Sequence, residues 1–178
     1  VIAVSVTFLS VGNFTSGFIF VIIFLAIGGS IGAFIAYRIP MTAMPELVAG
    51  FHSLVGLAAV FVAISAFINP AAFNLGIPGN IKLASLIEMS IGAAVGAITF
   101  SGSVIAFLKL QGIMSGAPIT FKAQHLINLI LGLTIIFLIY YLCRSQSPNI
   151  FWSIVAISFL LGVPLIIPIG GADMPVVI

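Results

Sequence analysis

Apolar residues run almost without interruption along this chain, in blocks long enough to cross a lipid bilayer as helices. A helix needs about 20 apolar residues to span the hydrocarbon core, and these blocks lack the alternating pattern of a barrel strand. Because lipid offers no hydrogen-bond partners, the backbone of each block is expected to be helical. Five blocks are predicted as transmembrane helices, at 14–37, 45–68, 81–110, 122–142 and 150–169.

The segments between and beyond these blocks carry turn-forming residues or are too short to span. Segment 69–80 holds two prolines, two glycines and three asparagines and is predicted as a loop. Segment 1–10 is apolar but short, and 173–178 begins another helix directly after a Gly-Gly pair. The predicted fold class is therefore all-α: a polytopic transmembrane helix bundle of five full spans plus two truncated helices, in a piece of a longer chain.

The composition agrees with a membrane protein and excludes several other classes. Hydrophobic residues make up 62% of the 178 residues and charged residues only 4%, whereas a soluble domain has about a quarter charged residues. Such a chain is neither a soluble domain, a disordered segment nor a nucleic-acid binder. The single cysteine, Cys143, excludes an internal disulfide and a multi-cysteine metal site.

Lysine and arginine positions give a weak prediction of orientation, because these residues favour the cytoplasmic side of a membrane. The predicted spans place Arg38, Lys109 and Lys122 on one side, and Lys82 and Arg144 on the other. The side with three basic residues is assigned to the cytoplasm, or to the matrix in a mitochondrion. Lys109 and Lys122 flank a loop and are expected to anchor to lipid headgroups, and His125 is expected at the interface.

Small residues at a spacing of four predict close contacts between helix backbones. Gly28 and Gly32 form one such pair, and Gly92 and Gly96 form another. This spacing is common in membrane helices and indicates helix packing rather than a particular function.

The dipeptide Met-Pro occurs twice, at 44–45 and 174–175, each time at the start of an apolar helix on the same predicted side. Proline suits the first helical turn, because its missing N–H has no intrahelical partner there. Thr42 or Asp173, just upstream, can cap the free N–H groups of these helices. Two interpretations remain open: two ordinary helix starts at membrane entry, or duplication of a functional element.

His52 is the main candidate for proton transfer. An ionisable residue inside a span is costly and usually faces a bundle interior or a water path. His52 lies about two turns into its span, roughly 10 Å from the proline at the helix start. Small residues at helical spacing are expected to leave room for water beside it: Ala49, Ser53, Gly56 and Ala59. Because the unperturbed pKa of histidine lies near neutral, an imidazole here can load and unload a proton. The alternative is a histidine that only bonds helices together.

Three more polar residues are candidates for the same path. Glu88 lies near the membrane side opposite Glu46, and is either the outer end of a proton path or a residue that reaches the interface. Ser103 either lines a hydrated path next to His52 or bonds to a carbonyl of its own helix. Glu46 follows Pro45 directly and is expected to interact with its own helix N-terminus.

Three segments together resemble a known family. They read MTAMPELVA and FHSLVGLAAV (41–49 and 51–60), TFSGSVIAF followed by KLQG (99–107 and 109–112), and GGADMPVV (170–177). In this order they are similar to the membrane domain of the beta subunit of the proton-translocating nicotinamide nucleotide transhydrogenase. The resemblance covers most of the chain from residue 28 to the end.

The resemblance implies an enzyme complex that transfers hydride between NAD(H) and NADP(H) and couples this transfer to proton movement across the membrane. Residues 1–178 are then the transmembrane proton-channel domain, and NAD and NADP bind other domains, so that no cofactor or metal is expected here. His52 falls on the family's proton-channel histidine, Ser103 on a channel-lining serine, and Glu88 on an acidic residue associated with the channel.

The resemblance also implies partners and a location. It places Glu46 and Asp173, with Pro45 and Pro175, at helix starts that face the NADP(H)-binding domain and couple the domains. The implied partners are that domain of the same chain, an alpha subunit or NAD-binding domain, the lipid bilayer and a second copy in a homodimer; nucleic acid is not among them. The implied location is a bacterial, or mitochondrial, inner membrane.

Some features depart from the family pattern or leave alternatives open. Many relatives carry an acidic residue where this chain has Ala43, and some relatives have asparagine at the position of His52. A channel asparagine and the NADP(H)-binding domain are expected beyond residue 178. The alternative functions are a secondary transporter for a small solute, built from internal helix repeats, and a purely structural membrane subunit.

Overall fold

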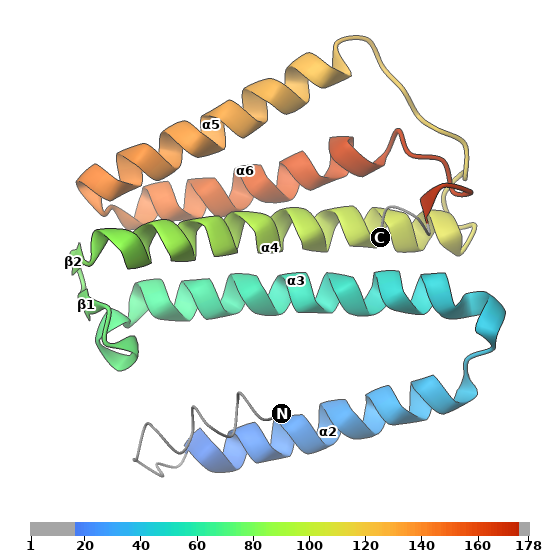
Figure 1. Ribbon diagram of the computed structural model, residues 1–178, viewed down its shortest axis with the longest axis horizontal. Helices are drawn as coiled ribbons and strands as arrows, with labels where there is room; N and C mark the ends of the chain where they lie inside the picture. The colour runs from blue at the N-terminus through green and yellow to red at the C-terminus, as the bar shows by residue number, and fades with distance from the viewer. Residues whose placement is uncertain (1–16, 175–178) are drawn as a thin grey trace. The chain divides into compact units, whose positions relative to one another are not determined.

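The computed structural model describes residues 17–174. Two predicted features lie outside these residues: the truncated helix at 1–10, and the second Met-Pro helix from Pro175 onward. Within the described residues, five helices are long and apolar enough to cross a membrane, which confirms the prediction (Figure 1). They are α2 (Gly17–Arg38), α3 (Met44–Ile68), α4 (Leu83–Leu110), α5 (Gln124–Ser145) and α6 (Pro148–Ile166).

The chain divides into two units, 1–41 and 42–178. The first contains α2, a helix of 22 residues whose only basic residue in the last turn is Arg38. The guanidinium carbon of Arg38 lies 5.2 Å from the centre of the Phe34 ring. This distance allows a cation–π contact at the helix end.

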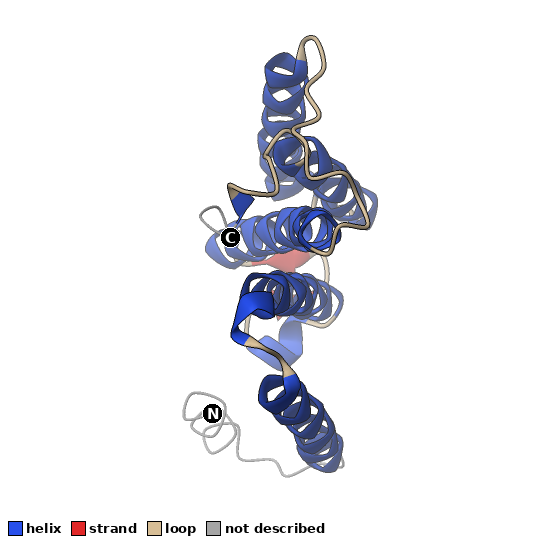
Figure 2. Ribbon diagram, turned by 90° about the vertical axis from the view of Figure 1, so that its right-hand side faces the viewer, coloured by secondary structure: helices blue, strands red, loops and turns tan. Residues whose placement is uncertain are grey.

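The second unit contains the four-helix unit, α3 to α6. Its helices lie side by side in the order α3, α4, α6, α5 (Figures 1 and 2). Helix α4 runs antiparallel to α3 and in the same direction as α6, and α5 returns antiparallel to both. Because α4 contacts all three other helices, its residues occupy the centre of the unit.

Glycines bring α3, α4 and α6 into backbone contact. A Cβ atom on Gly56 of α3 would lie 2.7 Å from the carbonyl oxygen of Gly96 of α4, and a Cβ on Gly96 would lie 2.7 Å from the carbonyl oxygen of Gly56. On α6, a Cβ on Gly162 would lie 2.5 Å from the carbonyl oxygen of Ile98. The predicted contact therefore holds for Gly96, whereas a Cβ on Gly92 would meet nothing within 4 Å.

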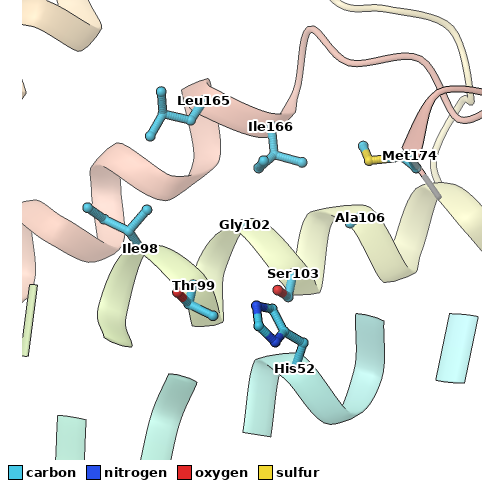
Figure 3. A pocket seen from close by; sticks show the side chains of 9 residues that line it. All are labelled: His52, Ile98, Thr99, Gly102, Ser103, Ala106, Leu165, Ile166 and Met174. Carbon is cyan, nitrogen blue, oxygen red and sulfur yellow. The ribbon is translucent and has the colours of Figure 1, made fainter. Parts of the chain in front are cut away.

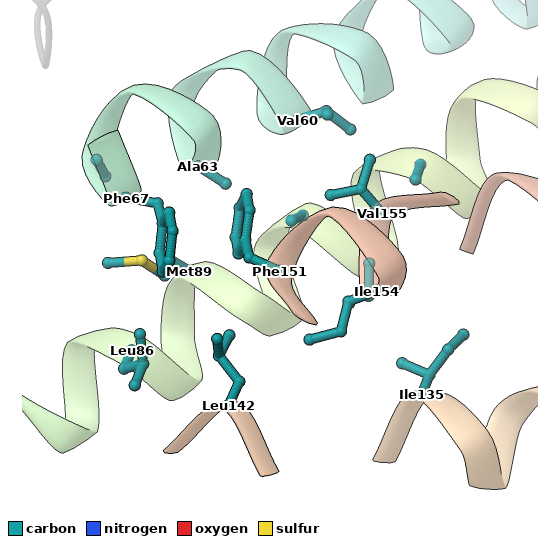
Figure 4. Close-up of a cluster of buried hydrophobic side chains, with 14 of the residues drawn as sticks. Val60, Ala63, Phe67, Leu86, Met89, Ile135, Leu142, Phe151, Ile154 and Val155 are labelled. Carbon is teal, nitrogen blue, oxygen red and sulfur yellow. The ribbon is translucent and has the colours of Figure 1, made fainter. Parts of the chain in front are cut away.

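One end of the four-helix unit holds a closely packed apolar core, called the core end here (Figure 4). It is formed where α3 and α5 end and where α4 and α6 begin. The rings of Phe67 and Phe151 stack with centroids 4.3 Å apart and planes 3° apart. Leu86, Leu142 and Ile154 are fully buried around them. Most large buried side chains of the unit gather here rather than around the polar residues at the opposite end.

The predicted loop at 69–80 contains more structure than expected. A 3-10 helix, η2 (Pro70–Phe73), is followed by a two-strand hairpin, β1 (Gly76–Ile77) and β2 (Asn80–Ile81). In its register Gly76 pairs with Ile81 and Ile77 with Asn80. Ile81, predicted as the first residue of a span, therefore belongs to a strand, and the helix begins at Leu83.

Candidate functional site

A cavity of about 190 Å³ lies between α3, α4 and the end of α6 (Figure 3). Its volume is enough for about six water molecules, at about 30 Å³ each in the liquid. It falls below the range of about 300–1,000 Å³ typical of small-molecule sites. Its lining residues are His52 of α3, Ile98, Thr99, Gly102, Ser103 and Ala106 of α4, Leu165 and Ile166 of α6, and Met174.

His52 occupies the edge of α3 that borders this cavity. The ring rises from α3 toward Thr99 and Ser103 of α4 (Figure 3). The residue is also exposed, so that the imidazole is open to the flank of the helices as well as to the cavity. Among the described residues, no apolar side chains enclose the ring, and the cavity lies on one side of it.

The small residues around His52 do not have the predicted effect. Ala49, Ser53 and Gly56 were expected to leave room for water, but all three are buried, and Gly56 contacts the backbone of α4. The expectation was wrong because small residues in a helix allow a neighbouring backbone to approach and thereby remove space. The space beside the imidazole comes from other elements, since the cavity wall opposite it is formed by Gly102 and Ala106 of α4.

Ser103 differs from its neighbour Ser101, two residues away. The Ser101 hydroxyl donates to the carbonyl oxygens of Ala97 and Ile98 in its own helix. Ser103 is 7% exposed and lines the cavity, and its hydroxyl makes no hydrogen bond to any other described residue. It can therefore both donate and accept hydrogen bonds toward the cavity.

Glu88 is not brought to the cavity. It is exposed in the second turn of α4, 15 positions before Ser103, which corresponds to about 22 Å along the helix axis. It lies toward the core end of the unit, the side opposite Glu46. The structure therefore separates Glu88 from His52 by most of the length of α4.

Glu46 and Asp173 lie at the same end of the four-helix unit as the cavity, called the cavity end here. The Glu46 carboxylate, in the first turn of α3 beside Pro45, accepts a hydrogen bond of 2.6 Å from Gln111 Nε2. The exposed Asp173 lies in a turn closed by its own N–H, which donates to the Gly170 carbonyl oxygen. Both predicted coupling residues thus share one face, although 127 positions separate them.

Two details of the Met-Pro segments were not predicted. The cap of α3 is Ala43, which makes no side-chain hydrogen bond, so the expectation that Thr42 caps this helix was wrong. Met174 of the second segment is fully buried, where it packs against Ala49 and Ala106 and lines the cavity. The side chain before the second proline therefore contacts the wall of the His52 cavity.

Lys109 contradicts its prediction most clearly. It was expected to reach lipid headgroups, but it is only 3% exposed. Its ammonium donates to the carbonyl oxygens of Ile167, Ile169 at 2.9 Å and Ala117 at 3.3 Å. This role was not predicted, because the acceptors lie in two loops. The only sign of unpaired carbonyl groups in the sequence was the prolines and glycines of those loops. Lys122 and His125 are exposed.

Gln111, Gln124 and Asn128 were also missed. Gln124 Nε2 donates to the carbonyl oxygen of Pro164 at 3.0 Å, and Asn128 Nδ2 lies 3.5 Å from the same oxygen. Pro164 interrupts α6 near its end, and polar side chains of α5 bond to its carbonyl group. An amide pair one helical turn apart, at 124 and 128, was the available signal in the sequence.

Helices of membrane-spanning length, with an imidazole and a hydroxyl at one cavity between them, define a multi-pass membrane protein. Comparison with known proteins identifies its family. A model of the family described as NAD(P) transhydrogenase beta subunit matches residues 1–178, and the chain belongs to this family.

Two relatives show the same relationship. The chain is 51% identical over 177 residues to the NAD(P) transhydrogenase subunit beta of Rhodospirillum rubrum, and equally to the subunit of that name from a specified strain of this organism. Each alignment covers 99% of this chain and 38% of the relative. The chain therefore spans well under half the length of the curated relatives that it matches.

Proposed function

We propose that this chain is the proton-translocating membrane domain of an NAD(P) transhydrogenase, and that it couples proton movement to hydride transfer between NAD(H) and NADP(H). The observation that carries the proposal is the cavity shared by His52 and Ser103, in a chain of the transhydrogenase beta subunit family. NAD and NADP are assigned to other domains of the complex, because the chain belongs to a transhydrogenase subunit family.

The chemistry assigned to the site is proton uptake and release by His52. A neutral imidazole accepts a proton on its free ring nitrogen, becomes positively charged, and returns the proton when water or another acceptor reaches it. The Ser103 hydroxyl can accept a hydrogen bond from the charged ring or donate one to the neutral ring. The cavity has room for the water molecules that supply and remove the proton. Glu88 is assigned to the outer end of the path, although it does not line the cavity beside His52.

The coupling follows from the position of Met174 in the cavity wall. A charge on His52 changes the environment of Met174, whose neighbour Asp173 is exposed at the cavity end. Coupling between two sites is reciprocal, so nucleotide binding must also change the proton affinity of the cavity. A membrane potential of 100 mV supplies about 2.3 kcal/mol per proton, which corresponds to roughly a fortyfold shift of an equilibrium.

The proposal includes partners and a location. The partners are the NADP(H)-binding domain of the same chain, an alpha subunit or NAD-binding domain, and a second copy in a homodimer. The location is the inner membrane of a bacterium or a mitochondrion. Glu46, Pro45 and Asp173, together at the cavity end, form the surface that faces the NADP(H)-binding domain. The family match gives no support to a secondary transporter, and the few polar groups of the cavity suit a solute poorly.

The test replaces His52 by alanine in the full complex, reconstituted in lipid vesicles. We expect proton uptake, followed with a pH-sensitive dye, to fall at least a hundredfold, while the amount of assembled complex stays the same. His125→Ala is the matched control, because His125 is an exposed histidine that does not line the cavity, and it should pump normally. Normal pumping by His52→Ala would refute the proposal.

A further inference from the structure

Lys109 is a buried cation to which the proposed proton path assigns no role. It lies in the last turn of α4, and its ammonium donates to three backbone carbonyl oxygens, those of Ala117, Ile167 and Ile169. An ammonium has three N–H donors, so these acceptors satisfy all of them. A buried charge is costly unless it is hydrogen-bonded in this way. The arrangement is therefore a built site rather than a chance burial.

The acceptors belong to two segments that are far apart in the sequence. Ala117 lies in the loop 111–123, and Ile167 and Ile169 lie in the turn 167–174 that follows α6. Two backbone bonds join the same segments: Gly171 N–H donates to the Gly116 carbonyl oxygen at 2.8 Å, and Ile119 N–H to the Ile167 carbonyl oxygen. We call Lys109 and its three acceptors the Lys109 junction.

The junction lies directly after the end of α6. A helix leaves its last carbonyl groups without intrahelical donors, and a lysine near the C-terminus satisfies them and interacts favourably with the helix dipole. The span was predicted to continue to residue 169, but α6 ends at Ile166, and Lys109 bonds to carbonyl groups just beyond it. The ammonium from α4 therefore acts as the cap of α6.

The junction lies between the cavity and the surface assigned to domain coupling. On one side, Ala106 of α4 and Ile166 of α6 line the His52 cavity. On the other side, the turn that Lys109 holds carries Asp173 and the buried Met174. A displacement of the cavity wall can reach this turn through Met174 and through the carbonyl groups that Lys109 holds.

We propose that Lys109 is a positioning residue for coupling: its ammonium fixes the loop 111–123 and the turn 167–174 to α4, so that a charge change at His52 moves them as one body. This inference rests on the proposed function. Without the ammonium, the two segments keep their two backbone bonds and the turn keeps the packing of Met174, but they lose the one side chain of α4 that binds both of them. The number of protons moved per hydride transferred is then no longer fixed, although hydride transfer itself continues.

The test compares Lys109→Met with Lys122→Met in the full complex reconstituted in vesicles. Both changes remove one positive charge, but Lys122 is exposed. Amide hydrogen exchange is measured by mass spectrometry on peptides covering 111–123 and 167–174. We expect exchange in both segments to rise at least tenfold in Lys109→Met, and the number of protons moved per hydride to fall below half. Lys122→Met should match the unaltered complex in both measurements.

The ratio of protons to hydride separates positioning from a loss of folded protein. A variant that only lowers the amount of intact complex reduces both rates together and leaves their ratio unchanged. If Lys109→Met does not assemble, Lys109→Gln takes its place, since it keeps an amide donor without the charge. A ratio within a fifth of the unaltered value, or an equal loss in Lys122→Met, would overturn the inference. An unaltered complex that moves no protons would instead refute the proposed function, while the exchange comparison would still test the junction.

Discussion

The core end and the cavity end of the four-helix unit use opposite means of holding helices together. At the core end, large apolar side chains fill the space, and the Phe67 and Phe151 rings stack at 4.3 Å. At the cavity end, helix ends are held by polar side chains that reach across to carbonyl groups, with Lys109 bonded to three of them. The first arrangement is closely packed, whereas the second leaves a cavity of about 190 Å³.

This difference suits two different roles inside lipid. Apolar packing has no preferred alternative arrangement and favours a rigid structure. A hydrogen-bonded end next to a polar cavity can respond to the charge of one imidazole, because the interactions of a charge are strong where water is scarce. The comparison assigns stability to the core end and proton coupling to the cavity end, and each assignment can be tested separately.

The largest expected effect on stability comes from Phe151→Ala at the core end. Phe151 is 1% exposed, and removing a buried aromatic ring costs about 3–5 kcal/mol. The thermal midpoint of the full-length subunit in detergent should therefore fall by roughly 6–20 °C, at about 2–4 °C per kcal/mol. The measurement is a thermal melt of the purified subunit.

The control is Trp152→Ala, the next residue, which is 50% exposed and should lower the midpoint by less than a third as much. Assembled Phe151→Ala complex should retain its ratio of protons to hydride. A changed ratio at permissive temperature would contradict the division of roles between the two ends.

The helices of both ends could be predicted from the sequence, because the length of an apolar block alone decides whether it spans. The helix boundaries were predicted to within three residues. Within the second unit, the prediction that Lys109 and Lys122 lie at one end of the helices, and Lys82 and Arg144 at the other, was also correct. The rotation of each helix about its own axis could not be predicted from the sequence. Gly92 and Gly96 share one spacing, yet only Gly96 meets the backbone of α3.

Polar residues were predicted less well than apolar ones, since their partners lie far away along the chain. Lys109 is near the end of a span, where lysine commonly reaches the membrane surface. Its burial depends on a turn 58 positions further on, which no local pattern reveals. His52 and Ser103 were singled out because polar residues are rare in spans, and the structure brings both to one cavity. Their roles in proton transfer stay predictions.

The next effect in size is expected from Ser103→Ala at the cavity end. The change removes a hydroxyl that makes no hydrogen bond to any residue of the described part, so the thermal midpoint should stay within about 2 °C. Proton translocation should slow by roughly tenfold or more, because a hydrogen bond to a charged group contributes about 1.5–3 kcal/mol. The measurement is the initial rate of proton uptake into vesicles.

Ser101→Ala is the matched control, since the Ser101 hydroxyl bonds to its own helix and does not line the cavity. Its pumping rate should remain within twofold of the unaltered complex. Equal slowing by both variants would mean that serine content of α4, rather than the position of Ser103 beside His52, matters for translocation.

The smallest expected effect concerns the Glu46–Gln111 hydrogen bond on the surface of the cavity end. Glu46→Gln keeps the size of the side chain and removes its charge, so the 2.6 Å bond from Gln111 loses its charge-assisted strength. The bond is exposed, and we expect its loss to change the apparent affinity for NADP(H) by about two- to threefold. A double-mutant cycle with Gln111→Ala should give an interaction free energy of about 0.5 kcal/mol, the lower limit for residues in contact.

Additive single effects would show that Glu46 acts without Gln111, either on the N-terminus of α3 or on the nucleotide-binding domain.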